Sequence, residues 1–218
     1  MTEYHKINTV FKRDQNTKFR TLLEGEYSIP AFEYLAKNEW VFTEKIDGTN
    51  IRIMWDGTKV TFGGKTDSAN IPAFLVQKLI DTFPAEKIAS VFTSGPACLY
   101  GEGYGAKIQS GGNYIPDGCG FILFDIQCGK WWLERSNVED IGAKLNIPVV
   151  PIIGMGTLLD AVEKTRAGFP SMVGKCVAEG IVMRPSVELI DRGGNRIISK
   201  IKHKDFKNAP PVQTTYNK

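Results

Sequence analysis

Histidine is scarce in this sequence, which has only His5 and His203 among 218 residues. That scarcity argues against a Ser-His-Asp mechanism and against zinc sites that depend on histidine ligands. Cys-x-x-Cys pairs are also missing, so zinc-ligand spacing is absent. We therefore expect reduced cysteines that lie in strands or in the core. The four are Cys98, Cys119, Cys128 and Cys176.

Long apolar runs are missing as well. No segment approaches the roughly 20 apolar residues that span a bilayer. The first fourteen residues, MTEYHKINTVFKRD, are polar and lack the apolar core of a signal peptide. We therefore expect a soluble, intracellular, cytoplasmic protein with no membrane partner.

Charge is nearly balanced over the whole chain but uneven along it. The formal net charge is +3, yet residues 192–207 hold six basic side chains and only one acid. Such a cluster suits a polyanion, for example a nucleotide or a nucleic acid. A solvated basic face would give the same pattern, so this cluster alone does not assign a function.

Hydrophobic periodicity predicts an α+β protein dominated by antiparallel strands. Residues 1–40 show little pattern apart from a short helix at 30–36, and Asp56-Gly57 predicts a hairpin turn. Ser136 with Glu139 resembles a capping box in front of a helix at 141–145. The other helices are expected at 72–83, 85–92 and 158–168, and strands at 40–46, 50–55, 59–64, 97–105, 120–127, 149–153, 179–185 and 196–203.

Lys45 is the most informative residue, in the segment Glu44-Lys45-Ile46-Asp47-Gly48-Thr49-Asn50. An unprotonated lysine amine can attack the α-phosphorus of a nucleotide. Lys45 ends an apolar strand, and Gly48 lets the backbone approach a ligand closely. An exposed lysine beside a hairpin turn gives the same short pattern, so the Lys-x-Asp-Gly motif is weak alone.

Five further segments follow Lys45 in a fixed order, and they extend the pattern to residue 202. They are Gly64-Lys65-Thr66, Tyr100-Gly101-Glu102-Gly103, residues 121–126, residues 178–184 and Ser199-Lys200-Ile201-Lys202. Together with the Lys45 segment, this series resembles motifs I, Ia, III, IIIa, IV and V of the covalent nucleotidyltransferase superfamily. That superfamily contains polynucleotide ligases and mRNA-capping enzymes.

Within the superfamily, the sequence most resembles the RNA ligase 2-like group of phage and kinetoplastid RNA-editing ligases. Asn50 is the main reason, because DNA ligases usually carry arginine at that place. Lys65 departs from the pattern, since many members have arginine there, and bidentate phosphate binding is then lost. The resemblance implies a ligase/capping-type nucleotidyltransferase domain, with antiparallel sheets flanked by helices in an ATP-grasp-like arrangement.

The resemblance also implies roles for single residues. Lys45 would form lysyl-AMP with ATP, the AMP donor, while Lys200 and Lys202 would hold phosphates and lower the pKa of Lys45. Both lysines point to one strand face because side chains alternate. Asp47 and Glu179 would organise Mg²⁺ or Mn²⁺, in part through water. The remaining ATP-binding residues would be Glu44 and Phe124 at the adenine, Glu102 at the ribose, and Asn50 and Lys65, which would also help to bind an acceptor 5′-phosphate.

The implied activity is ATP-dependent RNA ligation, with RNA 5′-phosphate and 3′-hydroxyl ends as substrates. A DNA strand in a hybrid duplex and an accessory RNA-binding protein are further possible partners. We expect an adenylyltransferase domain over residues 1–207 and a flexible tail over 208–218, without a C-terminal OB or helical domain. The alternatives are a DNA ligase, a capping guanylyltransferase, a non-catalytic nucleic-acid-binding module, and a structural protein with chance motifs.

Overall fold

The computed structural model describes residues 3–206, so Lys207 and the predicted tail at 208–218 lie outside the described residues. The described chain forms two compact units. Unit 1 contains the residues up to Lys6, Ile46–Pro151 and Pro170–Cys176. Unit 2 contains Ile7–Lys45, Ile152–Phe169 and the chain from Val177 on. The chain passes from unit 2 to unit 1 directly after Lys45.

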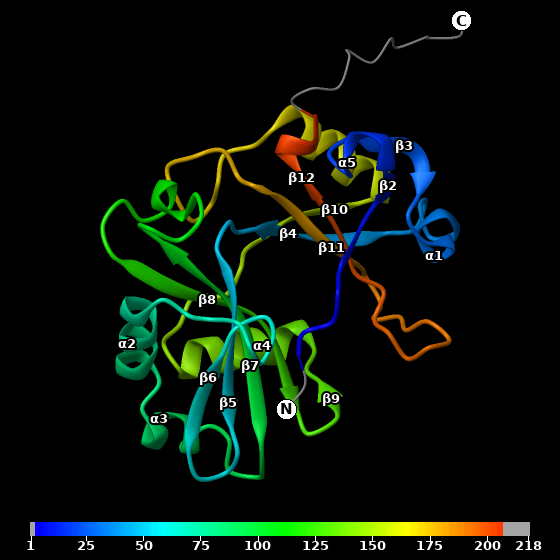
Figure 1. The fold of residues 1–218 in the computed structure, drawn as a ribbon. Helices are drawn as coiled ribbons and strands as arrows, with labels where there is room; N and C mark the ends of the chain where they lie inside the picture. Colours follow the sequence, from blue (N-terminus) through cyan, green and yellow to red (C-terminus); the bar gives the residue numbers. More distant parts are fainter. Residues whose placement is uncertain (1–2, 207–218) are drawn as a thin grey trace, which may run out of the picture. The chain divides into compact units, whose positions relative to one another are not determined.

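Unit 1 is built on an antiparallel sheet of five strands in the order β6-β5-β7-β8-β9 (Figure 1). Alternation of polar and apolar residues predicts its four longer strands, and the structure confirms them. Its hairpin turn at Asp56-Gly57 is also confirmed, since the Asp56 side chain accepts hydrogen bonds from the backbone of Thr58 and Lys59. The strands are β5 (Thr49–Trp55), β6 (Val60–Gly63), β7 (Ala97–Gly105), β8 (Cys119–Cys128) and β9 (Trp131–Trp132).

Three helices pack on one face of this sheet. Their apolar side chains, including Leu75, Ile88 and Val138, meet Ile53 and Leu99 of the strands in one core. The other face carries Asn50 and the polar residues described below. The helices are α2 (Ala73–Thr82), α3 (Ala85–Ala89) and α4 (Arg135–Lys144), with a short 3₁₀ helix, η2 (Gly111–Asn113).

The predicted capping box at the start of α4 is wrong. The helix begins earlier, with Glu134 as its N-cap residue and no side-chain cap hydrogen bond, so Ser136 lies inside the helix. Glu139 instead pairs with Arg135 at 2.7 Å, which the i,i+4 spacing within one helix allows. A capping box does occur at Thr157 and Asp160, at the start of α5 (Leu158–Ala167).

Unit 2 contains a second five-stranded sheet, in the order β1-β12-β11-β4-β10, and a separate two-stranded sheet, β2-β3. All pairings are antiparallel except β1 with β12. The strands are β1 (Asn8–Thr9), β2 (Phe11–Arg13), β3 (Leu22–Tyr27), β4 (Trp40–Lys45), β10 (Ile152–Gly156), β11 (Gly180–Pro185) and β12 (Ser199–Lys202).

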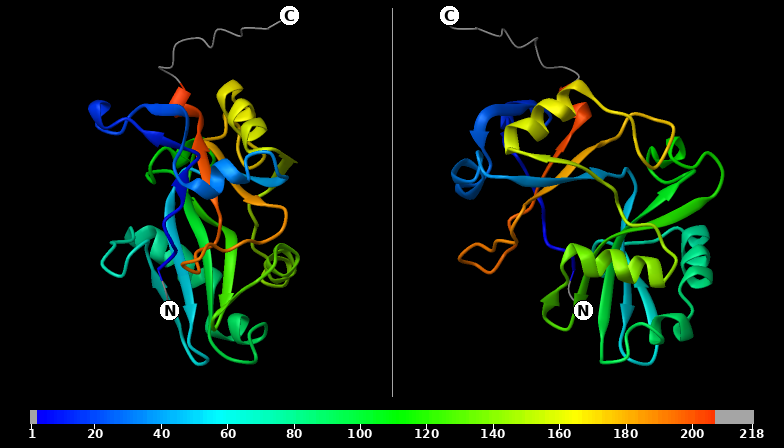
Figure 2. Two further views of the ribbon diagram at one scale, coloured as in Figure 1. Left: turned by 90° about the vertical axis from the view of Figure 1, so that its right-hand side faces the viewer. Right: turned by 180° about the vertical axis from the view of Figure 1, so that it is seen from behind.

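Helix α5 and the short helix α1 (Pro30–Tyr34) cover the apolar face of the larger sheet. Leu158 and Val162 of α5 and Phe32 of α1 pack with Phe42 and Ile181 of the strands. Figure 2 shows α5, in yellow, beside the strands of this unit. Two 3₁₀ helices complete the unit, η1 (Gln15–Thr17) and η3 (His203–Phe206).

Sequence periodicity misplaced some elements of unit 2. The strand expected at 149–153 begins only at Ile152, and the strand expected at 196–203 is confined to Ser199–Lys202. Strands β1 and β2 were not anticipated because two and three residues are too few to show alternation. Strand β3 was missed because its sequence, LLEGEY, does not alternate. The α+β class with antiparallel sheets flanked by helices is confirmed. Within residues 3–206, no helix is both long and apolar enough to cross a membrane.

Candidate active site

Three strands of unit 2 bring the predicted catalytic lysines together. Gly180 of β11 is paired with Lys45 of β4 on one side and with Lys202 of β12 on the other. Directly paired residues of antiparallel strands project to the same face. Lys45 and Lys202 therefore lie on one face of the sheet, on either side of a residue without a side chain.

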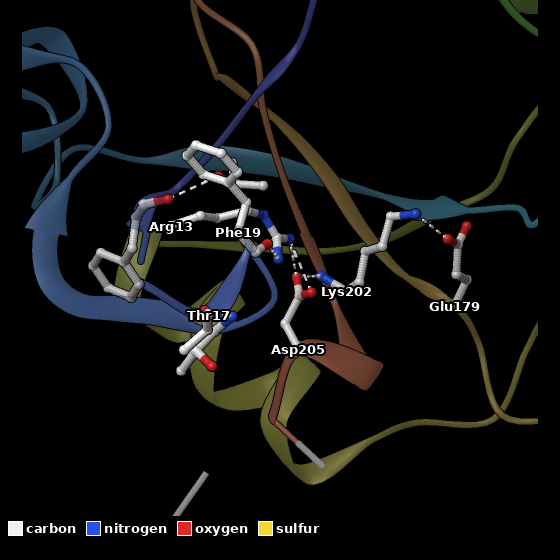
Figure 3. Close-up of polar contacts among 9 residues, drawn as sticks. Arg13, Thr17, Phe19, Glu179, Lys202 and Asp205 are labelled. Carbon is white, nitrogen blue, oxygen red and sulfur yellow. Dashed lines mark hydrogen bonds and ion pairs between the residues drawn. The ribbon is translucent and has the colours of Figure 1, made fainter. Parts of the chain in front are cut away.

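Glu179 joins the two lysines. Its Oε2 lies 2.6 Å from Lys45 Nζ, and its Oε1 lies 2.7 Å from Lys202 Nζ. The Glu179 side chain is only 9% exposed, whereas the two lysine side chains are 18% and 23% exposed. Figure 3 shows the Lys202 and Glu179 side chains pointing toward each other. One nearly buried carboxylate thus holds two partly exposed ammonium groups at a single point.

Gly180 is required by the close approach of the strands. A Cβ atom at this position would lie 2.8 Å from Lys202 Cα and 3.0 Å from the carbonyl carbon of Ile201, and closer still to the Ile201 carbonyl oxygen. Those are backbone atoms, which no side-chain rotation can move. The glycine therefore allows β12 to bring Lys202 close to Glu179.

Lys200 shares the face of Lys202, as the alternation predicts. It is paired with Val182 of β11 and with Thr9 of β1. Glu44 differs, because it is paired with Ile181, whose side chain belongs to the apolar core. The Glu44 side chain is 1% exposed and lies on the opposite face of β4 from Lys45. The Glu44 side chain therefore does not share the sheet face that carries Lys45.

In unit 1, Asn50 and Glu102 are directly paired on β5 and β7, on the face opposite the helices. The side-chain Oδ1 of Asn50 is buried and has no hydrogen-bond partner within residues 3–206. Gly48 packs against β7, where an added Cβ would lie 2.9 Å from Glu102 Cγ. The glycine of the Lys-x-Asp-Gly motif thus lets the turn approach Glu102, a contact that the sequence alone did not indicate.

Arg52 is a residue of this face that the sequence reasoning missed. Its side chain is 1% exposed, its Nε donates to the Gly64 carbonyl at 2.8 Å, and its Nη2 pairs with Asp67 at 2.7 Å. Arg52 therefore ties down the segment that carries Lys65, whose own side chain is exposed. The signal was present, because the alternation in NIRIMW places Arg52 on the same face as Asn50.

Phe124 lies in a β-bulge of β8. Tyr100 is paired with Asp125 and Gly101 with Leu123, which leaves Phe124 as the extra residue. The ring of Tyr4 meets the Phe124 ring edge-on at 5.1 Å, and the Tyr4 hydroxyl donates to buried Asp125 at 2.8 Å. Tyr4 was also missed, since a contact over 121 residues leaves no local pattern.

The two predicted metal-organising carboxylates belong to different units. Asp47, in unit 1, accepts a hydrogen bond from the Ser110 backbone at 3.2 Å. Glu179, in unit 2, is held by Lys45 and Lys202. Among residues 3–206 there is no group of three or more histidine, cysteine, aspartate or glutamate side chains that could hold a metal ion.

The cysteines are free thiols, and their surroundings disfavour the reactive thiolate. Burial raises the pKa of Cys98 to about 11, against hydrogen bonding from Tyr100 and the charge of Arg52, which lower it. Burial also raises the pKa of Cys119 and of Cys128. A cysteine nucleophile is therefore not favoured at these three positions.

Comparison with known proteins identifies a family and similar folds. A family model described as RNA ligase matches residues 38–202. The fold is similar to that of a Naegleria gruberi RNA ligase variant with ATP and Mn, at a TM-score of 0.65 and 20% identity over 94% of this chain and 59% of that one. It is also similar to the same organism's RNA ligase with PPi, at a TM-score of 0.62 and 19% identity over 92% and 59%.

The chain thus spans less than two thirds of the length of these solved structures. At such low identity, the likeness shows the fold alone. No curated protein matches the sequence. The family model, however, covers most of the chain, from the residues before β4 to Lys202 at the end of β12, and includes Lys45 and Glu179. The chain therefore belongs to the RNA ligase family.

Proposed function

We propose that this protein is an ATP-dependent RNA ligase that works through a lysyl-AMP intermediate at Lys45. The observation that carries the proposal is the bridging of Lys45 and Lys202 by Glu179, in a chain of the RNA ligase family. A nucleophilic amine, a second cation for phosphate and a carboxylate are the groups that nucleotidyl transfer needs.

The reaction would have three displacements at phosphorus. First, the Lys45 ammonium group releases a proton to water, Nζ forms a bond to the α-phosphorus of ATP, and the bond to pyrophosphate breaks. Next, an oxygen of the RNA 5′-phosphate attacks the AMP phosphorus, which frees the Lys45 amine and gives an adenylylated RNA end. Finally, the RNA 3′-hydroxyl attacks the 5′-phosphorus, so that a phosphodiester forms and AMP leaves. Positioning and charge neutralisation supply most of the rate in such steps.

Glu179 has two parts in this proposal. Its ion pair with Lys45 must break before that amine can attack the nucleotide. It also fixes the position of Lys45 Nζ beside Lys202. When the triphosphate enters, its negative charge competes with Glu179 for both lysines. Lys200 and Lys202, on one strand face, then hold the phosphate oxygens as the negative charge moves to the leaving pyrophosphate.

The carboxylate oxygens that we assign to this site are suitable ligands for a divalent ion. Mg²⁺ and Mn²⁺ prefer oxygen ligands, and Mg²⁺ usually takes one or two carboxylates together with substrate phosphates. Glu179 offers such a carboxylate beside the nucleophile, and Asp47 offers a second one two residues after Lys45 in the chain. A bound ion would neutralise phosphate charge.

Unit 1 would supply nucleotide and RNA contacts. We assign Phe124 to stacking on the adenine ring, Glu102 to the ribose hydroxyls, and Asn50 with Lys65 to phosphate. The buried and unsatisfied Oδ1 of Asn50 supports a polar ligand beside Glu102. The Glu44 side chain is not included, since it lies on the core face of β4.

Covalent labelling by α-labelled ATP, without RNA, tests the proposal. We expect label on the wild-type chain and none on Lys45→Ala, because that variant lacks the amine that Glu179 holds beside Lys202. Lys144→Ala is a matched control, since Lys144 pairs with exposed Asp140 on α4 and should label normally. Label that persists in Lys45→Ala would refute the proposed nucleophile.

Substrate choice needs a second assay. ATP and GTP are compared as donors, and nicked RNA and nicked DNA as acceptors. Sealing of RNA with ATP supports the proposal. Preference for GTP would indicate a capping guanylyltransferase, preference for DNA a DNA ligase, and absence of both label and sealing a non-catalytic nucleic-acid-binding module.

A further inference from the structure

The tip of the β2–β3 hairpin in unit 2 has an unusual backbone. Lys18 and Phe19 are consecutive residues with positive φ, 54° and 61°. This left-handed region is unfavourable for residues with a Cβ, and for a bulky residue such as phenylalanine it is rare. The Phe19 side chain is nevertheless 57% exposed, so burial of its ring does not compensate for the strain.

Hydrogen bonds hold the tip in this conformation. The Phe19 backbone N–H donates to the Asp14 carbonyl at 2.9 Å, and the Lys18 N–H donates to the Gln15 carbonyl at 3.0 Å. The Thr17 hydroxyl donates to Asp14 O at 2.9 Å and accepts from the backbone of residue 21 at 3.1 Å. The exposed ring is therefore presented on a fixed turn.

The same tip is connected to the candidate active site through Arg13. Arg13 Nη1 donates to the Phe19 carbonyl at 3.4 Å, and Nη2 contacts both carboxylate oxygens of Asp205 at 2.8 and 2.9 Å. Asp205 in turn accepts from the backbone N–H of Lys202 at 3.2 Å. Figure 3 shows this series from Phe19 to Lys202 and Glu179. The hairpin tip and the phosphate-binding lysine thus share one polar network within unit 2.

The charge around Phe19 is positive in sum, since Lys18 and Arg20 outnumber Asp14 of the same turn. Lys18 and Arg20 on either side are exposed, and neither has an ion-pair partner within residues 3–206. The nearest acids of β3 are already paired, Glu26 with Lys12 and Glu24 with Arg166. An exposed aromatic ring between two unpaired cations is the combination that binds a nucleic-acid strand, by stacking a base and contacting phosphates.

We propose that Lys18, Phe19 and Arg20 form a binding site for a single-stranded segment of the RNA substrate, with one base stacked on Phe19. This inference rests on the proposed ligase function, and it adds a place where the RNA strand is held in unit 2. Stacking on an aromatic ring tolerates any base, so the site contributes affinity without sequence preference. The connection through Arg13 and Asp205 keeps the held strand in a fixed relation to Lys202.

The test is fluorescence anisotropy with a 5′-phosphorylated oligouridylate that carries a 3′ fluorophore. Phe19→Asn removes the ring and tolerates positive φ, so RNA binding should weaken about 5-fold to 100-fold without a lower melting temperature. Phe19→Leu keeps an apolar side chain and the backbone strain but should weaken binding similarly, whereas Phe19→Tyr should bind like wild type. Tyr34→Ser, which removes an 86% exposed ring of α1 in the same unit, is the matched control.

The flanking cations are tested by salt dependence. Exchanging Lys18 and Arg20 together for glutamine should reduce the slope of log affinity against log salt by about 0.7 for each lost phosphate contact. The proposal would be overturned if Phe19→Asn and Phe19→Leu bound RNA with wild-type affinity and the double variant of Lys18 and Arg20 kept the wild-type salt slope. A loss of binding in Phe19→Asn that Phe19→Leu fully restores would also overturn it, since stacking would then not be the cause.

Labelling of Lys45 by ATP without RNA separates this proposal from the ligase function. All hairpin variants should label at the wild-type rate, because the tip contacts RNA and not ATP. A wild-type chain that binds the oligouridylate through Phe19 but never labels would refute the ligase function alone. A chain that labels normally and binds RNA independently of the tip would refute the hairpin site alone.

Discussion

Substitution of Gly180 by alanine tests whether the spacing of β11 and β12 sets the position of Lys202. The added Cβ would lie 2.8 Å from Lys202 Cα, whereas carbon atoms in good contact are about 3.5–4.0 Å apart. The neighbouring backbone must therefore move by about 1 Å. Overpacking of this kind costs about 1–3 kcal/mol. For a chain of this length the melting temperature should fall by about 2–4 °C per kcal/mol.

The catalytic effect should exceed the effect on stability. A misplacement of about 1 Å in a reacting group can lower a rate about 100-fold. We therefore expect Gly180→Ala to label Lys45 with ATP about 100-fold more slowly than wild type, at a temperature where the variant is still folded. Initial labelling rates and a thermal unfolding curve measure the two effects separately.

Gly112→Ala is the matched control for this experiment. Its added Cβ would have Ala106 Cα as its nearest neighbour, at an ordinary distance of 3.8 Å. It should label and melt like wild type. If Gly180→Ala behaved in the same way as Gly112→Ala, the close approach of β11 and β12 would be wrong. If it melted lower but labelled at the wild-type rate, the position of Lys202 would not control the reaction.

Two further predictions concern unit 1. Tyr4→Phe removes the donor to buried Asp125 but keeps the ring against Phe124, so the free energy of unfolding in urea should fall by about 1–3 kcal/mol; an unchanged value would argue against that hydrogen bond. Burial raises the pKa of the Cys98 thiol from 9.0 to about 11. The unfolded chain therefore loses this proton at a lower pH than the folded chain does. The free energy of unfolding should then decline from about pH 9 towards about pH 11. In urea unfolding across that range, the free energy of unfolding should fall by roughly 2–3 kcal/mol more for wild type than for Cys98→Ala. Equal decreases in the two proteins would contradict the burial of the thiol.

Much of the fold could be predicted because it follows from local alternation. The face of β5 that carries Ile51 and Ile53 packs against helices, and the opposite face carries Asn50 and Arg52, as a period of two requires. The start of α4 could not be predicted in this way. Ser136 and Glu139 fit a cap by spacing, but Arg135 reaches both Glu139 and the Val150 carbonyl from within the helix.

The candidate site also has features that local sequence patterns predict and features that they do not. The order of the motifs identified Lys45, Glu102, Phe124, Glu179 and Lys202 as candidates. The alternation of β12 placed Lys200 and Lys202 on one face, and the register with β11 confirms it. The same rule applied to β4 separates Glu44 from Lys45, a consequence that the motif resemblance alone did not reveal.

By itself, the sequence determined the strand faces and the single motifs, because each depends on residues within a few positions of one another. The order of those motifs along the chain, which the sequence also contains, identified the candidate nucleophile. Only the tertiary structure decided which groups meet. Glu179 contacts Lys45 across 134 residues, and Arg13 contacts Asp205 across 192. No local preference encodes such pairs, since they exist only after distant strands have paired and the side chains between them have packed.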